Sequence, residues 1–357
     1  MRSTIPGGGT RQGPAGSPVS AAAPLRSHRV SVSSRRMESD CTVGAMEVRD
    51  AAEIADLAST AAAEPLEEVV VVDLRVNSHA DLRPLAGLPR IVVGITESGS
   101  AAVDVAVTTE DEARVLVAAA QANPIAATAL VLHLRHVGAQ SITGGLVAES
   151  ATYSMLQAGP EHARWLASRS HRARPSETEG RVRVQRNGGR VRIELARPRS
   201  RNAVDAAMQQ AIVDALTAAA DADEILLTGE GPVFSAGGDL DEFGTLADPA
   251  SAHLLRLSRS PARALAPLAD RTTVVVQGAC HGAGVELPAF AQHVVARREA
   301  TFTLPEIGMG LIPGAGGTVS IPRRIGRQRT AWLAITGHPL DVDTARTWGL
   351  VDDIVDP

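Results

Sequence analysis

Three glycine-rich segments in the second half of the chain constrain the fold more than any other feature. The first, residues 234–240, follows an apolar run at residues 224–228, and the second, residues 278–287, follows another at residues 272–276. A third lies at residues 304–318. Short apolar runs are typical of buried strands, and glycine-rich turns after them commonly lead into helices. The repeated order of strand, turn and helix predicts a wound parallel sheet with helices outside it.

A hairpin marks the start of this half. Val182 and Val184 alternate with arginine, residues 191–195 alternate in the same way, and Asn187-Gly188 lies between the two runs. Asn-Gly supplies the positive φ values that a tight hairpin turn requires. Helices are expected after the hairpin at residues 203–220, with Asn202 as N-cap, and at residues 250–268.

A chain of 357 residues is long for one domain, and its first half indicates a second unit. Apolar runs that alternate with helical segments predict a small α/β unit there. Its expected strands are residues 69–74, 90–95, 103–108 and 127–134, and its expected helices are residues 46–66, 110–122 and 150–168. The predicted division is a disordered tail (1–45), an N-terminal unit (46–168), an Arg-, Ser- and Pro-rich linker (169–180) and a C-terminal domain (181–357).

Composition excludes several functions. Every basic residue is arginine, so the chain has no Walker A lysine, no Schiff-base lysine and no lysine base. A net charge of -5 and few aromatic residues argue against nucleic-acid binding. Cys41 and Cys280 fit neither a disulfide framework nor a metal-ligand spacing, so we expect no metal and a cytoplasmic setting. No apolar run reaches the roughly 18 residues of a membrane helix, and we expect no membrane partner.

The order and spacing of three motifs resemble those of the enoyl-CoA hydratase/isomerase (crotonase) family: FSAGGDL at 234–240, GACHGAGVEL at 278–287 and PEIGMGLIPGAGGT at 305–318. The resemblance runs from about residue 181 to residue 354. It implies an α/β fold of the crotonase-like ββα spiral type (the ClpP/crotonase superhelix), with the small N-terminal α/β unit attached to it. It also implies an enzyme of fatty acid metabolism that acts on acyl-CoA thioesters.

Site roles follow from the resemblance, residue by residue. The N–H groups of Gly238 and Ala283 would form an oxyanion hole, and Glu286 and Glu306 would be the two catalytic carboxylates. Removal of one oxyanion donor typically costs about 3 kcal/mol of transition-state stabilisation. The residues expected to contact the substrate or its coenzyme A are Arg199, Arg201, Ala236, Gly237, Asp239, Gly282, Pro313 and Gly314.

The presence of both carboxylates favours a hydratase. Addition of water across the C2=C3 bond of a 2-enoyl-CoA needs one group that takes a proton from water and another that delivers one to C2. By resemblance, Glu286 activates the water and Glu306 exchanges the proton at C2. Coenzyme A is part of the substrate, so no separate cofactor is expected. The alternatives are isomerisation or thioester hydrolysis by the same family, or an acyl-CoA-binding protein without turnover.

Several polar residues have two readings. His281 is either a hydrogen-bonded structural histidine or a substrate contact. Asp239 is expected to brace its turn as well, and Cys280 to be a small buried residue. The stretch from Arg169 to Arg201 contains eleven arginines against three acids. It is either a solvated hairpin edge or a region that attracts the coenzyme A phosphates, with Arg201 the better candidate.

The N-terminal unit is interpreted as a decayed copy of the C-terminal domain. Residues 85–95 and 103–113 faintly echo residues 268–278 and 293–300, and no counterpart of the helix that carries Glu286 lies between them. The unit is therefore expected to be non-catalytic. Family members usually continue with C-terminal helices that cover the acyl pocket and support trimers or hexamers. The C-terminal domain is expected to lack these helices, and the N-terminal unit could replace them as a lid.

Overall fold

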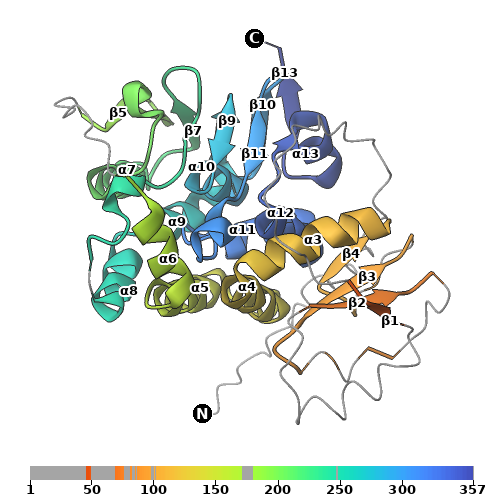
Figure 1. Ribbon diagram of the computed structural model, residues 1–357. Helices are drawn as coiled ribbons and strands as arrows, with labels where there is room; N and C mark the ends of the chain where they lie inside the picture. Colours follow the sequence, from red (N-terminus) through yellow and green to blue (C-terminus); the bar gives the residue numbers. More distant parts are fainter. Residues whose placement is uncertain are drawn as a thin grey trace, which may run out of the picture.

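The first half of the chain forms one sheet and the second half forms two, and helices of both halves pack between and around them (Figure 1). The computed structural model describes residues 46–49, 69–75, 81–82, 85, 87–97, 100, 102–170, 180–246 and 248–356. The predicted tail and most of the predicted linker lie outside the described residues.

The C-terminal domain contains a six-stranded sheet in the order β13-β10-β8-β7-β6-β5, parallel except for the β5–β6 hairpin. Its strands are β5 (Val182–Asn187), β6 (Arg190–Leu195), β7 (Glu224–Gly229), β8 (Thr272–Val276), β10 (His293–Arg297) and β13 (Asp353–Val355). A smaller sheet contains β9 (Ala279–His281), β11 (Thr301–Thr303) and β12 (Leu340–Asp341).

Two strands and a helix recur as a unit in this domain. The chain runs from β8 through β9 into α10 (Ala283–Glu286), and again from β10 through β11 towards α11 (Gly317–Ile325). Each step moves from the large sheet to the small one, where β9 and β11 pair in parallel. The other helices are α7 (Ala206–Ala218), α8 (Pro249–Ser258), α9 (Pro261–Leu265), α12 (Arg327–Thr336) and α13 (Val342–Trp348). The predicted wound parallel sheet is thus present, as a spiral of ββα units.

Three local predictions in this domain need correction. The helix expected from residue 203 begins at Ala206, and its N-cap is Asp205, whose side chain accepts the Met208 N–H. The two hairpin turn residues are Gly188 and Gly189, because Asn187 still pairs with Arg190. The single helix expected at residues 250–268 is broken, since Pro261 starts a new helix.

The N-terminal unit contains a four-stranded parallel sheet in chain order. Its strands are β1 (Val48–Arg49), β2 (Val69–Asp73), β3 (Ile91–Ile95) and β4 (Val105–Val107). The strands predicted at residues 69–74, 90–95 and 103–108 are confirmed. The helix predicted at residues 46–66 is wrong at its start, because β1 pairs there with β2, and the rest of it lies outside the described residues. The adjacent parallel pairs β3–β4 and β8–β10 occupy the echoed segments, and the decayed-copy interpretation stays a prediction.

Four helices follow this sheet: α3 (Glu110–Ala122), α4 (Pro124–Val137), α5 (Ile142–Gln157) and α6 (Pro160–Ser168). The first confirms its prediction. The strand expected at residues 127–134 is wrong, because these residues lie inside α4. A short continuous apolar run does not by its pattern distinguish a strand from a helix. The helix expected at residues 150–168 is two helices, divided where Gly159-Pro160 interrupts the backbone hydrogen bonds.

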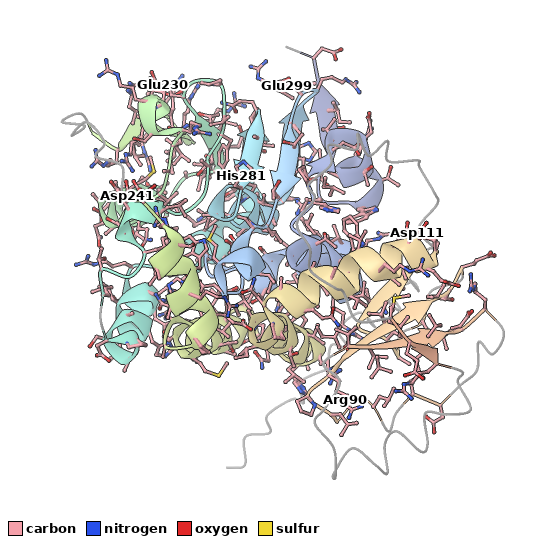
Figure 2. The ribbon with its side chains drawn as sticks, in the orientation of Figure 1. Arg90, Asp111, Glu230, Asp241, His281 and Glu299 are labelled. Carbon is pink, nitrogen blue, oxygen red and sulfur yellow. The ribbon has the colours of Figure 1, made fainter. Side chains whose placement is uncertain are left out.

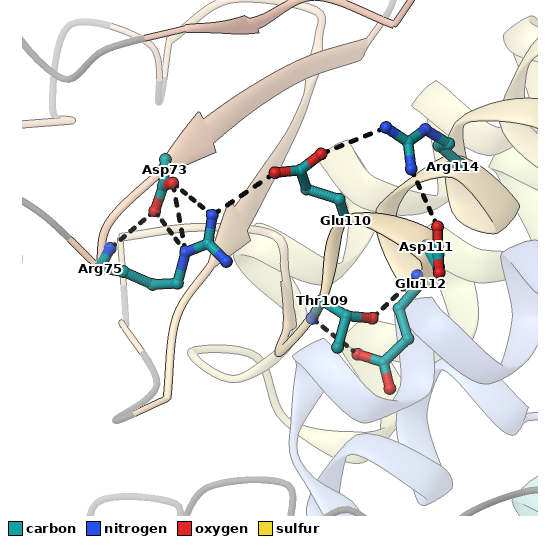
Figure 3. A network of polar contacts seen from close by, with 7 residues as sticks. All are labelled: Asp73, Arg75, Thr109, Glu110, Asp111, Glu112 and Arg114. Carbon is teal, nitrogen blue, oxygen red and sulfur yellow. Dashed lines mark hydrogen bonds and ion pairs between the residues drawn. The ribbon is translucent and has the colours of Figure 1, made fainter.

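The start of α3 shows why this helix was predictable from the sequence (Figure 3). Thr109 caps it by accepting the Glu112 N–H, and the Glu112 carboxylate accepts the Thr109 N–H in return. Glu110 lies between two arginines, 3.6 Å from Arg75 and 3.2 Å from Arg114. These exposed pairs contribute little individually, whereas the reciprocal cap satisfies two N–H groups that the helix leaves free.

The two halves are joined through helices and not only through the linker. In Figure 1, α4, α5 and α6 run beneath α11 and the sheets of the C-terminal domain. Asp104, which is buried beside β4, accepts hydrogen bonds from Arg135 of α4 and from Arg327 of α12. Within the described residues no single helix is long and apolar enough to cross a membrane; α3 and α4 would be so only as a pair, which bends by 111°.

Candidate active site

The first two glycine-rich segments pack against each other backbone to backbone. A Cβ atom on Gly284 would lie 2.3 Å from the carbonyl oxygen of Ser235, and one on Gly237 would lie 2.8 Å from that of His281 and 3.6 Å from the Gly282 Cα atom. Side chains at these glycines would therefore force the two segments apart. Gly238 follows Gly237, and Ala283 lies between Gly282 and Gly284. The close contact of the two backbones therefore places Gly238 and Ala283 at the same junction.

Gly238 and Ala283 present backbone N–H groups that are not used by the fold. Among the described residues, no acceptor receives either N–H group. Ala283 is the first residue of α10, where the N–H groups of a helix have no partner within the helix. Gly282 before it has φ 46° and ψ -116°, a conformation that glycine tolerates and other residues rarely adopt. Two free N–H groups at one junction are the elements of an oxyanion hole.

Glu286 and Glu306 converge on the same junction. Glu286 ends α10, and Glu306 begins a one-turn helix, Glu306–Met309; both side chains are buried. A Cβ atom on Gly282 would lie 2.4 Å from Oε1 of Glu306 and 3.8 Å from Oε1 of Glu286. The two carboxylates therefore border one space in front of the Gly282 Cα atom.

The second oxygens of the two carboxylates have different surroundings. Oε2 of Glu286 accepts the N–H groups of Ala315 and Gly317, at 2.7 and 2.8 Å. Oε2 of Glu306 is buried, and none of the residues that the structure describes forms a hydrogen bond with it. Burial raises the pKa of Glu306 to about 8, and burial together with the Glu306 charge raises that of Glu286, against the two N–H bonds. The two N–H bonds favour the ionised form of Glu286, and Oε2 of Glu306 receives no such bond from the described residues.

Helix α5 of the N-terminal unit reaches this site. The carboxylate of Glu149 is buried and accepts the N–H groups of Gly316 and Thr318, at 2.8 and 3.0 Å. One turn later, the Tyr153 ring covers Gly314, where a Cβ atom would lie 2.4 Å from the ring. Both residues therefore contact the third glycine-rich segment, which holds Glu286.

Helix α6 contacts the turn that carries Glu306. His162 Nδ1 lies 3.0 Å from the carbonyl oxygen of Met309, and the His162 ring stacks on Trp165. The ring of Phe243 lies against both of these residues, and a Cβ atom on Gly238 would lie 3.1 Å from it. Aromatic side chains from both halves of the chain, His162, Trp165 and Phe243, thus lie next to Gly238.

Sequence reasoning placed no functional residue on α5 or α6. The motifs that carried the resemblance all lie after residue 180, so the contribution of the N-terminal unit had no matching pattern. One signal was present: Glu149 is a lone carboxylate after seven residues without charge, ITGGLVA at 142–148. A single acid among small and apolar residues indicates a buried carboxylate that needs partners.

Arg199 and Arg201 lie beside the first glycine-rich segment. Both side chains are exposed, and no ion pair to either is found within the described residues. The carbonyl oxygen of Arg201 accepts the Ala236 N–H, and the Arg201 charge contributes, after burial, to a lowered pKa of His281. The loop at residues 197–201, called the arginine loop below, therefore borders both glycine-rich turns. Pro313 is buried, in the segment that precedes Gly314.

Asp239 does not face the junction as a free group. Its buried carboxylate lies 3.3 Å from Arg197 Nη1, and the same carboxylate accepts the Asp241 N–H at 3.2 Å. The expectation that Asp239 braces its turn matches this geometry better than its place among the substrate-contacting residues. Cys280 is fully buried, and burial raises its pKa to about 12. His281 is half-buried and lies in the interior of the view in Figure 2, below Glu230 and Glu299.

Asn202 holds the arginine loop to the first glycine-rich segment. Its Oδ1 accepts the Arg197 N–H at 2.8 Å, and its Nδ2 donates to the carbonyl oxygens of Glu230 and Val233. The side chain is completely buried, and the residue has φ 52°, which asparagine tolerates better than most residues. Its function is therefore to hold loop backbone, and not to cap α7.

Replacement of Asn202 by alanine should lower the free energy of unfolding by about 2–4 kcal/mol, because one N–H and two carbonyl groups would lose their partners in a buried place. Urea denaturation followed by circular dichroism measures this change. Asn187→Ala, at an exposed asparagine, is the matched control and should change stability by less than about 0.5 kcal/mol. Equal effects of the two substitutions would contradict the assignment.

Comparison with known proteins finds matches to the second half of the chain. The sequence profile described as enoyl-CoA hydratase/isomerase matches residues 185–357. The 2,3-dehydroadipyl-CoA hydratase of Escherichia coli (strain K12) is 34% identical over 158 residues, which are 43% of this chain and 61% of that protein. The 1,2-epoxyphenylacetyl-CoA isomerase of the same organism is 36% identical over 138 residues, 37% of this chain and 52% of that protein.

A solved structure, the enoyl-CoA hydratase from Thermoplasma volcanium GSS1, has 33% identity, covers 50% of this chain and 73% of its own, and gives a TM-score of 0.45. The chain spans about half to three fifths of the two curated relatives. The matched region contains all three glycine-rich segments and both buried carboxylates. Through residues 185–357, the chain therefore belongs to the enoyl-CoA hydratase/isomerase family, a family of enzymes with the crotonase fold.

Proposed function

We propose that this protein adds water across the C2=C3 bond of a 2-enoyl-CoA thioester. The observation that carries the proposal is the convergence of Glu286 and Glu306 on Gly282, beside the unused N–H groups of Gly238 and Ala283. Hydration is the reaction that needs all four of these groups. An isomerisation needs the oxyanion hole and one proton carrier, and a thioester hydrolysis has no proton to deliver to C2.

The proposed mechanism divides the proton transfers between the two carboxylates. Ionised Glu286 takes a proton from a water molecule, and the water oxygen bonds to C3. The electron pair of the C2=C3 bond moves towards the thioester oxygen, where the N–H groups of Gly238 and Ala283 stabilise the negative charge. Protonated Glu306 then delivers its proton to C2. The product is a 3-hydroxyacyl-CoA, and transfer of the proton from Glu286 back to Glu306 restores the site.

We propose that the arginine loop binds the phosphates of coenzyme A. Arg199 and Arg201 are exposed beside the glycine-rich turns, and a guanidinium group suits bidentate contact with phosphate. Coenzyme A enters as part of the substrate, so the reaction needs no separate cofactor. Assembly into a trimer or hexamer stays a prediction.

Hydration of crotonyl-CoA tests the proposal. The conjugated enoyl thioester absorbs in the ultraviolet, so the purified chain should cause a loss of absorbance that depends on enzyme concentration, with 3-hydroxybutyryl-CoA as the product found by mass spectrometry. Release of free thiol from crotonyl-CoA would indicate a hydrolase instead, and conversion of 3-enoyl-CoA without hydration would indicate an isomerase. Binding of crotonyl-CoA without any conversion would support a non-catalytic protein and contradict the proposal.

The pH dependence follows from the two protonation states. Above about pH 8, Glu306 loses the proton that it must deliver to C2, because burial places its pKa at about 8. On the acid side, Glu286 gains a proton and can no longer accept one from water, at a pH above the ordinary carboxyl range because burial raises its pKa. We therefore expect kcat/KM to form a bell whose alkaline side falls near pH 8. Initial rates with crotonyl-CoA measure the profile, and a rate that still rises above about pH 9 would contradict the assigned roles.

A further inference from the structure

Four successive backbone N–H groups at the start of α11 are shared by two carboxylates in alternation. Ala315 and Gly317 donate to Glu286, whereas Gly316 and Thr318 donate to Glu149. Gly316 is the N-cap of α11 and Gly317 and Thr318 are its first residues, so their N–H groups have no partner within the helix, and Ala315 immediately precedes them. Glu286 belongs to the C-terminal domain and Glu149 to α5, so the segment 315–318 is fixed from two sides by different halves of the chain.

The contact between α5 and α11 is built for close approach. A Cβ atom on Gly145, one turn before Glu149, would lie 2.9 Å from the side chain of Val319. The Thr318 hydroxyl donates to Glu149 at 2.7 Å. The same hydroxyl lies 2.8 Å from Nε2 of His133 on α4, so the imidazole donates to it. Glu149 thus has three donors, and a second helix of the N-terminal unit supports one of them.

We propose that Glu149, on the N-terminal unit, is a positioning residue for the catalytic carboxylate Glu286. Displacement of Glu149 would free the N–H groups of Gly316 and Thr318. The neighbouring N–H groups of Ala315 and Gly317, which hold Oε2 of Glu286, would then lose their fixed orientation. The catalytic pair would in this way depend on a residue that lies more than a hundred positions earlier in the chain. The proposal rests on the hydratase function proposed above.

Glu149 also adds a charge to the site. The titratable groups that face it are Glu286, Glu306, Arg256 of α8, Tyr153 on its own helix and His133 on α4. Burial raises the pKa of Glu149 to about 7, while its three donors and Arg256 oppose this rise. The charge of Glu149 in turn raises the pKa of Glu286 and of Glu306. Burial lowers the pKa of His133 to about 4, so this histidine is neutral and contributes a donor.

Glu149→Gln is the direct test. Glutamine has the same shape as glutamate, but one carboxylate oxygen becomes an amide nitrogen. This nitrogen cannot accept the N–H group of Gly316 or Thr318 that it would face. We expect kcat for crotonyl-CoA to fall by about 10- to 100-fold, the scale that small misplacement of a catalytic group produces. KM should change less than kcat. The alkaline side of the pH profile should move to lower pH, because removal of a negative charge lowers the pKa of Glu306.

Glu161→Gln is the matched control. Glu161 is also a buried glutamate of the N-terminal unit, and it also accepts two N–H groups at a helix start, those of Ile125 and Ala126 in α4. This substitution should cost similar stability without moving the pH profile. Thr318→Val, which removes one of the three donors to Glu149, should lower kcat by less than Glu149→Gln does, and it serves if Glu149→Gln folds poorly.

The outcomes separate this proposal from the proposed function. A wild-type chain that hydrates crotonyl-CoA, with unchanged kcat and pH profile in Glu149→Gln, would overturn the positioning role and leave the hydratase function intact. A wild-type chain without turnover would reject the hydratase function. The role of Glu149 is then measured with acetoacetyl-CoA, whose enolate absorbs in the ultraviolet. Glu149→Gln should lower the pH at which the bound thioester forms its enolate, and an identical pH in wild type and variant would overturn the proposal.

Discussion

Glu306→Gln should lower kcat for crotonyl-CoA hydration by about 10²- to 10⁴-fold, the usual contribution of a positioned proton donor. Glutamine has nearly the same shape as glutamate, but its amide does not release a proton near neutral pH and therefore cannot protonate C2. Since the substrate still meets the oxyanion N–H groups and the arginine loop, KM should stay within a few-fold of the wild-type value. Glu286→Gln should have an effect of the same order, because an amide cannot accept the proton of water. Steady-state kinetics with both variants measures this.

Stability distinguishes loss of chemistry from loss of fold in these variants. When folding raises the pKa of a carboxyl group, the free energy of unfolding of the protein falls as the pH rises from the group's ordinary pKa, 4.5, towards its folded-state pKa, about 8 for Glu306. Glu306→Gln removes this burden, so the variant should unfold at no lower urea concentration than wild type at pH 8. Glu299→Gln, at an exposed carboxylate of the same domain, is the activity control and should match wild type. Unchanged kcat in both Glu286→Gln and Glu306→Gln would reject the mechanism.

Gly282→Ala should reduce kcat/KM by about 10²-fold or more, the scale of an error of about 1 Å in catalytic geometry. The added methyl group would lie 2.4 Å from Oε1 of Glu306 and would enter the space that both carboxylates border. The φ of 46° at residue 282 is also unfavourable for alanine. Either the Glu306 side chain or the Gly282 backbone must move, and the Ala283 N–H moves with the latter.

Gly308→Ala is the matched control for this substitution. Gly308 lies in the same site, two residues after Glu306, but a Cβ atom there has no neighbour within 4 Å. Its activity should equal that of wild type within about two-fold, since most surface substitutions have small effects. Similar losses of activity in Gly282→Ala and Gly308→Ala would show that any alanine near the two carboxylates is harmful, and they would contradict the specific geometry at Gly282.

The C-terminal domain could be predicted from sequence because its local signals agree with its fold. Glycine at positions 237, 278, 282 and 284 is needed where backbones nearly touch or φ is positive, so the motifs record the site directly. Strands such as β8 are followed by glycine-rich turn residues that define their ends. The pairing of Glu286 with the N–H groups of Ala315 and Gly317 was beyond prediction, since it depends on tertiary placement of residues that have no special pattern.

The N-terminal unit was harder for physical reasons that specific residues illustrate. Helix α4 packs against α5, α11 and α12 and is apolar at most positions, its exposed side included, so the apolar run at residues 127–134 does not by itself distinguish a helix from a strand. Asn202 was assigned as a cap because capping and loop-holding asparagines look alike in sequence. Glu149 acts on residues that follow it by more than 160 positions, and no local pattern encodes such a contact.

The position of Glu149 ahead of its partners affects how the protein is made. Synthesis proceeds from the N-terminus at about 5–20 residues per second, so helix α5 is complete roughly 10–30 s before residues 315–318 exist to receive its carboxylate. During that interval Glu149 has water as its hydrogen-bond partner, because burial of the carboxylate without its donors would be costly. The buried contact between α5 and α11 can therefore form only after residues 315–318 have left the ribosome.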